Sequence, residues 1–237
     1  LVTCITDISM HPEWTASQTD IYLAPTQEIK RHLIKEGTRA EDILVTGIPV
    51  RQQFLDADCR QKRERNRTRR VLIMGGGLGL MPDLKELLEK LHSMQGVESV
   101  VITGKNHKMY EEWVNRYEDV EVLGYTENIS RYMRGADLVI TKAGGITLFE
   151  ILHSQVPLFV IHPFLEQEMN NARYAAEKGF AKVIWGRRED YIPELEKLLS
   201  DEKMMEEMTG NVRRACKEMI EVSLDEAVGI MEERMTA

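Results

Sequence analysis

The fold is decided at Thr141-Lys142-Ala143-Gly144-Gly145-Ile146-Thr147-Leu148-Phe149-Glu150, which continues the apolar run 138–141. An apolar run without alternating polar residues predicts a strand buried on both faces, and the two glycines predict a turn into a helix. The unbonded N–H groups at the start of such a helix suit a diphosphate. Glu150 falls about one and a half turns into the helix, where its carboxylate would accept hydrogen bonds from the vicinal hydroxyls of a ribose. A helix cap followed by an incidental surface glutamate fits the same pattern.

Short apolar runs recur along the chain and predict one parallel sheet. They lie at 71–74, 100–103, 120–123, 138–141, 158–161 and 182–184, separated by amphipathic stretches. The predicted fold class is therefore α/β, a Rossmann-like parallel sheet with helices on both faces. Helices are expected after Pro82, at 108–117, 128–134, 146–153 and 168–178, and along a tail at 189–234 whose methionines are interpreted as core residues.

Residues 1–55 differ from the remainder. Strands are expected at 1–8, 20–24 and 43–46 and a helix at 26–35, too few elements to cover both faces of a sheet. We therefore expect 1–55 to be the C-terminal part of a preceding α/β domain, and the chain to be a fragment or processed product. Residues 56–69 are predicted to be a basic linker, and 70–237 a second α/β domain with C-terminal helices.

Charge and composition exclude several classes of protein. The net charge is −8, which argues against nucleic acid as a partner, although seven Lys and Arg face only Glu64 between positions 60 and 70. That basic run is read as a solvated linker or as a contact for anionic lipid headgroups. No apolar run is long enough to span a bilayer. Asp56-Ala57-Asp58 lies in the predicted linker and not at a strand end, so no metal site is expected.

Two further ligand sites are expected at predicted strand ends. Met74-Gly75-Gly76-Gly77-Leu78-Gly79 lets the backbone approach an oxyanion, but it meets the dinucleotide spacing only in part. An NAD-dependent enzyme is therefore a minor alternative. The run from His162 to Ala172 places several amide and carboxylate side chains at the start of a helix, which suits a polyhydroxylated ligand or an ordinary helix N-terminus.

Taken together and in order, these motifs resemble one family of glycosyltransferases. It holds the monogalactosyldiacylglycerol synthases, the processive diacylglycerol glucosyltransferases and the peptidoglycan N-acetylglucosaminyltransferase (family 28 type). The matching residues are Val45-Thr46-Gly47-Ile48-Pro49-Val50-Arg51, the glycines at 75–77, Gly104-Lys105-Asn106, Gly124-Tyr125, 141–147 with Glu150, Gln167-Glu168 and Asn171-Ala172. At the front of the chain, Asp7, His11-Pro12, Trp14, Asp20 and Tyr22 resemble the glycolipid branch.

The resemblance implies a GT-B architecture of two facing domains. Residues 1–55 would then be the C-terminal part of the acceptor-side domain, and 70–237 the nucleotide-sugar-binding domain, which holds the UDP-sugar site. Amides near Gly77 and at 145–147 would face the diphosphate, with Arg51 on its other side, and Glu150 would face the ribose. The backbone near Tyr125 would read uracil, and Gln167 the sugar hydroxyls. The implied site comprises Arg51, Gly76, Gly77, Leu78, Tyr125, Thr126, Lys142, Gly144, Gly145, Ile146, Thr147, Glu150, Gln167, Glu168 and Asn171. Glu166 and Ala143 depart from the family pattern and leave the sugar open.

The implied activity is inverting transfer of a hexose from a UDP-sugar to a membrane lipid such as diacylglycerol. Preorganised amides with Lys142 or Arg51 would meet the charge of the leaving group, without a cofactor or metal. The general base is expected outside these residues, with Asp7 and His11 as acceptor-side candidates, so this chain is expected to bind UDP without transferring sugar. The expected location is the cytoplasm, peripheral at the inner face of the cell membrane. A UDP-N-acetylglucosamine transferase acting on a lipid-linked cell-wall precursor and a non-catalytic nucleotide-binding module remain alternatives.

Overall fold

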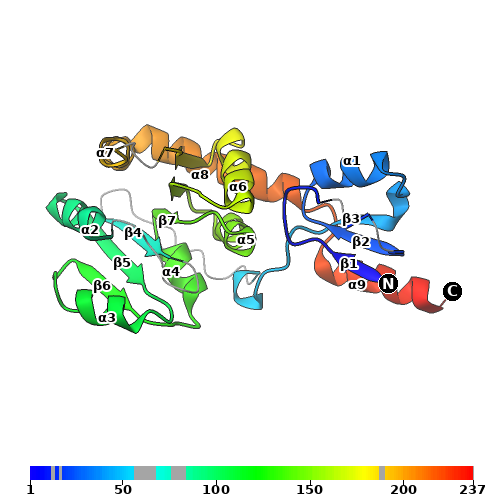
Figure 1. The fold of residues 1–237 in the computed structure, drawn as a ribbon, viewed down its shortest axis with the longest axis horizontal. Helices are drawn as coiled ribbons and strands as arrows, with labels where there is room; N and C mark the ends of the chain where they lie inside the picture. The colour runs from blue at the N-terminus through cyan, green and yellow to red at the C-terminus, as the bar shows by residue number, and fades with distance from the viewer. Residues whose placement is uncertain (12–13, 16–17, 56–67, 76–83, 187–189, 237) are drawn as a thin grey trace.

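The computed structural model describes residues 1–11, 14–15, 18–55, 68–75, 84–186 and 190–236. They form two separate parallel sheets side by side, a larger one in the second part of the chain and a smaller one in the first (Figure 1). The glycine-rich turn at 76–78 and most of the basic linker lie outside the described residues.

The larger sheet has six parallel strands and confirms the predicted fold class. Its spatial order is β6 (Val120–Leu123), β5 (Val97–Ile102), β4 (Arg69–Met74), β7 (Leu138–Thr141), β8 (Leu158–Ile161) and β9 (Ala181–Ile184). The strand order reverses between β4 and β7, and open α/β sheets bind their ligands beyond the carboxyl ends of the strands at such a point. The loop after β7 is therefore placed for a ligand.

Two cores, one on each face, hold the helices to this sheet. Alternate strand residues divide between them, so that Leu72 and Val139 enter one core and Val71 and Ile140 the other. The first core is covered by α4 (Ile129–Gly135), α5 (Gly145–Ser154), α6 (Glu166–Glu177) and α8 (Glu202–Met219), and the second by α2 (Leu84–Ser93), α3 (His107–Trp113) and α7 (Ile192–Ser200).

Several predicted boundaries are wrong. The helix expected to reach residue 117 ends at Trp113, because Asn115 adopts a left-handed φ of 60°. The tail is not one helix: the Asp201 side chain accepts a hydrogen bond from the Met204 amide at 2.9 Å and begins a new helix there. The prediction that methionines of the tail fill the core is confirmed at Met205, Met208 and Met219.

The smaller sheet consists of β1 (Val2–Cys4), β2 (Ile21–Ala24) and β3 (Ile43–Val45), all parallel and in that order. The first strand is shorter than predicted, because Asp7 accepts hydrogen bonds from the amide and hydroxyl of Ser9 and turns the chain. Helix α1 (Gln27–Lys35), capped by the Thr26 hydroxyl, covers one face through Ile29 and Leu33.

The C-terminal helix α9 (Leu224–Thr236) covers the other face of this smaller sheet. Ala227 is fully buried against Ile21 and Leu23, although the sequence places this helix with the second sheet (Figure 1). The amides of Glu221 and Val222 both donate to the Val45 carbonyl, at 3.0 and 3.1 Å. The end of the chain thus returns to its first sheet.

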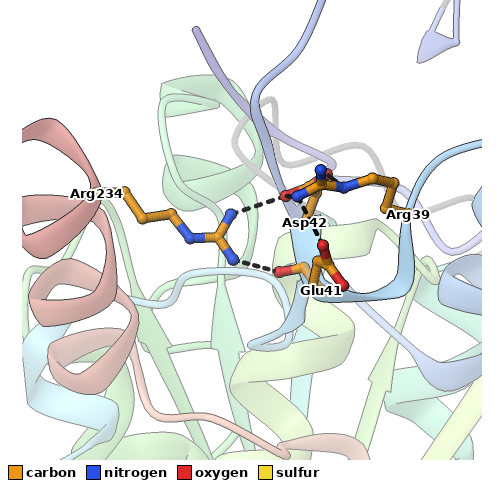
Figure 2. A network of polar contacts seen from close by, with 4 residues as sticks. All are labelled: Arg39, Glu41, Asp42 and Arg234. Atoms are coloured by element: carbon orange, nitrogen blue, oxygen red, sulfur yellow. Dashed lines mark hydrogen bonds and ion pairs between the residues drawn. The ribbon is translucent and has the colours of Figure 1, made fainter. Parts of the chain in front are cut away.

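A polar network fixes the far end of α9 (Figure 2). Arg234 donates to the Asp42 carboxylate at 2.8 Å and to the Glu41 carbonyl at 2.6 Å, and Arg39 pairs with both acidic side chains. Exposed ion pairs each contribute about 0–1 kcal/mol, so we assign most of the docking energy to the apolar contact. Within the described residues, every helix is too short or too polar to cross a bilayer.

Helix α9 provides a direct test of this packing. Substituting Ala227→Glu would bury a carboxylate without a partner, whereas Val228→Glu places the same charge at a position that is 46% exposed. We expect the first variant to lose amide-exchange protection in β1–β3 while β4–β9 keep theirs, and the second to resemble the unsubstituted chain. Equal protection patterns in the two variants would contradict the docking of α9 on the first sheet.

Candidate functional site

The N-terminus of α5 presents unbonded amides at the predicted ligand site. Gly144 is the N-cap residue, with extended backbone and no side-chain hydrogen bond to the first turn. The amides of Gly145 and Ile146 therefore have neither a capping side chain nor an intrahelical partner. A helix start of this kind, with its dipole, suits a negatively charged group at the end of β7.

The first part of the chain closes directly over this helix start. A Cβ at position 145 would lie 2.8 Å from the Thr6 carbonyl oxygen, so only glycine permits the contact. From the other side, the Asn171 side chain in α6 donates to the Ala143 carbonyl at 2.7 Å. Asn171 is buried, and its Oδ1 has no partner among the described residues. The turn before α5 is thus held from two sides.

The buried Glu150 side chain forms an ion pair with Arg51, whose own side chain is exposed. Glu150 is 4% exposed, and its Oε1 accepts from Arg51 Nε at 3.0 Å and Nη2 at 2.8 Å. The guanidinium lies 5.4 Å from the centre of the Phe54 ring. Burial raises the pKa of the Glu150 carboxyl, and the hydrogen bond and charge of Arg51 oppose that rise. Both described contacts fall on Oε1, which leaves Oε2 as an acceptor for a ligand.

The other predicted binding residues surround these two features. Tyr125 and Thr126 follow β6, and Tyr125 is 69% exposed. Lys142 follows β7 and is half-buried, while Ile146 and Thr147 lie on the first turn of α5. Gly76, Gly77 and Leu78 lie outside the described residues.

In the first turn of α6, Gln167 is exposed, whereas Glu168 accepts from the amides of Phe164 and Leu165 at 3.1 and 3.3 Å. That carboxylate therefore caps its own helix.

The two acceptor-side candidates lie in the turn after β1. Asp7 is buried and bonded to Ser9, and exposed His11 contacts Trp14 with ring centroids 6.3 Å apart. Asp7 thus has a structural task in this fold. Among the residues that the structure describes, no group of His, Cys, Asp or Glu is arranged to hold a metal ion.

Sequence reasoning missed a short segment that joins the two parts. Residues 51–54, here called the connector, include the 3-10 turn η3 (Gln52–Phe54). The sequence places them with residues 1–55, but Phe54 is buried in the first core of the larger sheet, as is Ile48 just before the connector. Gln53 donates to the Glu127 carbonyl at 2.8 Å and accepts from the Ser130 amide at 3.3 Å. No local pattern indicates these contacts, because their partners lie more than seventy residues away.

Family models match most of the chain. Residues 70–224 match the glycosyltransferase family 28 C-terminal domain, and residues 1–50 match monogalactosyldiacylglycerol (MGDG) synthase. The processive diacylglycerol beta-glucosyltransferase of Bacillus licheniformis is 35% identical over 88% of this chain. The enzyme of the same name from Bacillus subtilis is 33% identical, again over 88%. The chain spans 57% of the length of each of these relatives.

Solved structures show the same fold at low identity. The glycotransferase of kitacinnamycin superposes with a TM-score of 0.68 at 19% identity, over 91% of this chain and 55% of its own. MurG of Acinetobacter baumannii gives a TM-score of 0.67 at 14% identity, over 100% of this chain and 67% of its own. These likenesses extend across both sheets.

The close approach at Gly145 predicts a strict steric limit. In Gly145→Ala the new Cβ would press on the Thr6 carbonyl, and overpacking of this kind costs about 1–3 kcal/mol. Gly210→Ala is the matched control, because nothing lies within 4 Å of its Cβ and alanine stabilises a helix interior by about 0.5–1 kcal/mol. The midpoint of urea unfolding should therefore fall in Gly145→Ala and rise in Gly210→Ala. A stabilised Gly145→Ala variant would refute the contact.

The Arg51–Glu150 pair predicts a pH-dependent loss of stability in Arg51→Met. Without the guanidinium, burial acts unopposed and the pKa of Glu150 rises further. A carboxyl whose folded-state pKa exceeds its unfolded-state pKa contributes stability at low pH that is lost as pH rises through the folded pKa. We expect Arg51→Met to lose about 1–3 kcal/mol near neutral pH and less in acid.

Urea titrations at neutral and at acidic pH measure this difference. The control is the double variant Arg51→Met with Glu150→Gln, which has no carboxyl at position 150 and should lose the pH dependence. A deficit that is the same at every pH would show that the guanidinium acts through packing alone.

Proposed function

Since the chain belongs to the glycosyltransferases of family 28, whose C-terminal domain it matches over residues 70–224, we propose that it binds the UDP-sugar donor of an inverting glycosyltransferase. The acceptor is a membrane lipid such as diacylglycerol. The observation behind the proposal is the pairing, on one helix, of an uncapped N-terminus with a buried carboxylate. These two groups match the diphosphate and the ribose of a nucleotide.

In this proposal each part of the donor has its own partner. The diphosphate binds at the α5 amides beside Lys142, and the ribose hydroxyls bind Glu150 Oε2. The base binds along the loop at 124–128, and Gln167 bonds the sugar. When the acceptor hydroxyl attacks the anomeric carbon, negative charge grows on the leaving diphosphate. Amides that already point at that position stabilise the charge without reorganising, so no metal or other cofactor is required.

The proposed acceptor is taken from the names of the relatives. The names of both relatives describe glucosyltransferases that act on diacylglycerol. We propose the same acceptor, diacylglycerol, and the same transferred sugar, glucose, for the present chain. The reaction would take place at the inner face of the cell membrane, with the protein bound peripherally and Asp7 and His11 on the acceptor side. The names of the relatives favour this reading over transfer of N-acetylglucosamine to a cell-wall precursor.

Calorimetric titration with UDP tests the donor site. We expect UDP to bind more tightly than its 2′-deoxy analogue or NADH, because Glu150 accepts from the ribose hydroxyls. Glu150→Gln should weaken UDP binding by about tenfold, the loss expected for a charge-assisted hydrogen bond, and should narrow the difference between UDP and its deoxy analogue. Glu89→Gln, on the exposed face of α2, is the control.

Two results would count against the proposal. Binding of NADH in preference to UDP would identify a dinucleotide site, and equal affinity for UDP and the deoxy analogue would remove Glu150 from the ribose position. Saturation-transfer NMR with UDP-glucose, UDP-galactose and UDP-N-acetylglucosamine then compares the sugars. Stronger transfer to the ring protons of glucose is the expected result.

A further inference from the structure

The connector bonds the main chain on both sides of the junction between the loop at 124–128 and helix α4. Gln53 Nε2 donates to the Glu127 carbonyl at 2.8 Å, and Gln53 Oε1 accepts from the Ser130 amide at 3.3 Å. One side-chain amide therefore joins the end of the loop to the first turn of the helix. Both partners are backbone groups. The contacts therefore fix the path of the backbone at 127–130 and not the position of a single side chain.

Helix α4 depends on these contacts for its ends. Its N-cap residue, Asn128, makes no side-chain bond to the first turn, so the Ser130 amide relies on Gln53. At the other end, Arg134 Nη2 donates to the Phe54 carbonyl at 2.7 Å. Two consecutive connector residues thus hold both ends of α4, and the loop that precedes it has a fixed anchor.

The same segment contacts the proposed ribose position. Arg51, two residues before Gln53, holds the buried Glu150 carboxylate. The Cα atoms of residues two apart lie within about 7 Å of each other, so the two contacts belong to neighbouring positions. A nucleoside with its ribose at Glu150 would place its base toward the loop that Gln53 anchors.

We propose that Gln53 is a positioning residue for the nucleobase, which holds the loop at 124–128 where its backbone meets the base. The inference rests on the proposed function, because it takes the ligand to be UDP. Arg51 would orient the ribose-binding carboxylate in the same way. The connector is then part of the nucleotide site, although no atom of Gln53 need touch the ligand.

Two substitutions separate positioning from simple stabilisation. Gln53→Ala removes both hydrogen bonds. Gln53→Glu keeps an acceptor for the Ser130 amide, where the helix dipole favours a carboxylate, but it loses the donor to the Glu127 carbonyl. Gln53→Glu should therefore retain α4 and release the loop. Gln95→Ala removes the same type of side chain at an exposed turn position between α2 and β5, outside the connector, and is the matched control.

The measurement is the affinity for UDP and for ADP, by calorimetry, in each variant. We expect Gln53→Ala and Gln53→Glu to weaken UDP binding by about fivefold to tenfold and ADP binding by less, so that discrimination between the bases falls. Gln95→Ala should stay within about twofold of the unsubstituted chain. Amide chemical shifts at 124–130 should move in both Gln53 variants, while helical signals at 131–134 persist in Gln53→Glu.

The outcomes distinguish this inference from the proposed function. If the unsubstituted chain binds no UDP, the proposed function fails and the inference with it. If UDP binds but Gln53→Glu keeps the full preference for UDP over ADP, the inference alone is overturned. An equal loss for UDP and ADP in both variants, together with a lower unfolding midpoint, would also overturn it and leave Gln53 a stabilising residue.

Discussion

The contact between the Thr6 carbonyl and the first turn of α5 constrains the whole arrangement. Because a Cβ at position 145 would lie 2.8 Å from that oxygen, the helix starts with glycine, and its N-cap residue Gly144 offers no capping side chain. The absence of a side chain at position 145 lets the first part of the chain approach the carboxyl end of β7. The uncapped helix start and the junction between the two sheets thus depend on two adjacent glycines.

Electrostatics at the site follow from burial. Glu150 is enclosed by its own helix and the connector, and Arg51 offsets the cost of its charge. A fully buried ion pair would stabilise the fold little more than an apolar pair of similar size. The Arg51 side chain, however, is 47% exposed and keeps part of its hydration. The arrangement therefore keeps a carboxyl acceptor inside the protein while the guanidinium paired with it remains accessible from solvent.

The sequence predicted what depends on local pattern. The strands at 138–141 and 158–161 have the expected bounds, because uninterrupted apolar runs are typical of central parallel strands. The strand at 120–123 also has the expected bounds, although it lies at the edge of the sheet and contains the exposed Glu121. Glu150 was predicted from its spacing after the glycines and lies buried beside the helix start. The docking of α9 and the hydrogen bonds of Gln53 were not predicted, because they join segments far apart in the chain. Arg51 was expected at the diphosphate, yet it contacts Glu150, a distinction that requires coordinates.

The Val45 carbonyl lies where the chain crosses between the two sheets in both directions. The chain passes from the first sheet to the second just after Val45, and it returns at Glu221 and Val222, whose amides both bond that one oxygen. Beside it, Gly47 turns with a φ of 75° against the Phe149 ring. The two segments in which the chain crosses between the sheets are therefore joined at the Val45 carbonyl. A change in the angle between the two sheets must therefore be accommodated at both crossings together.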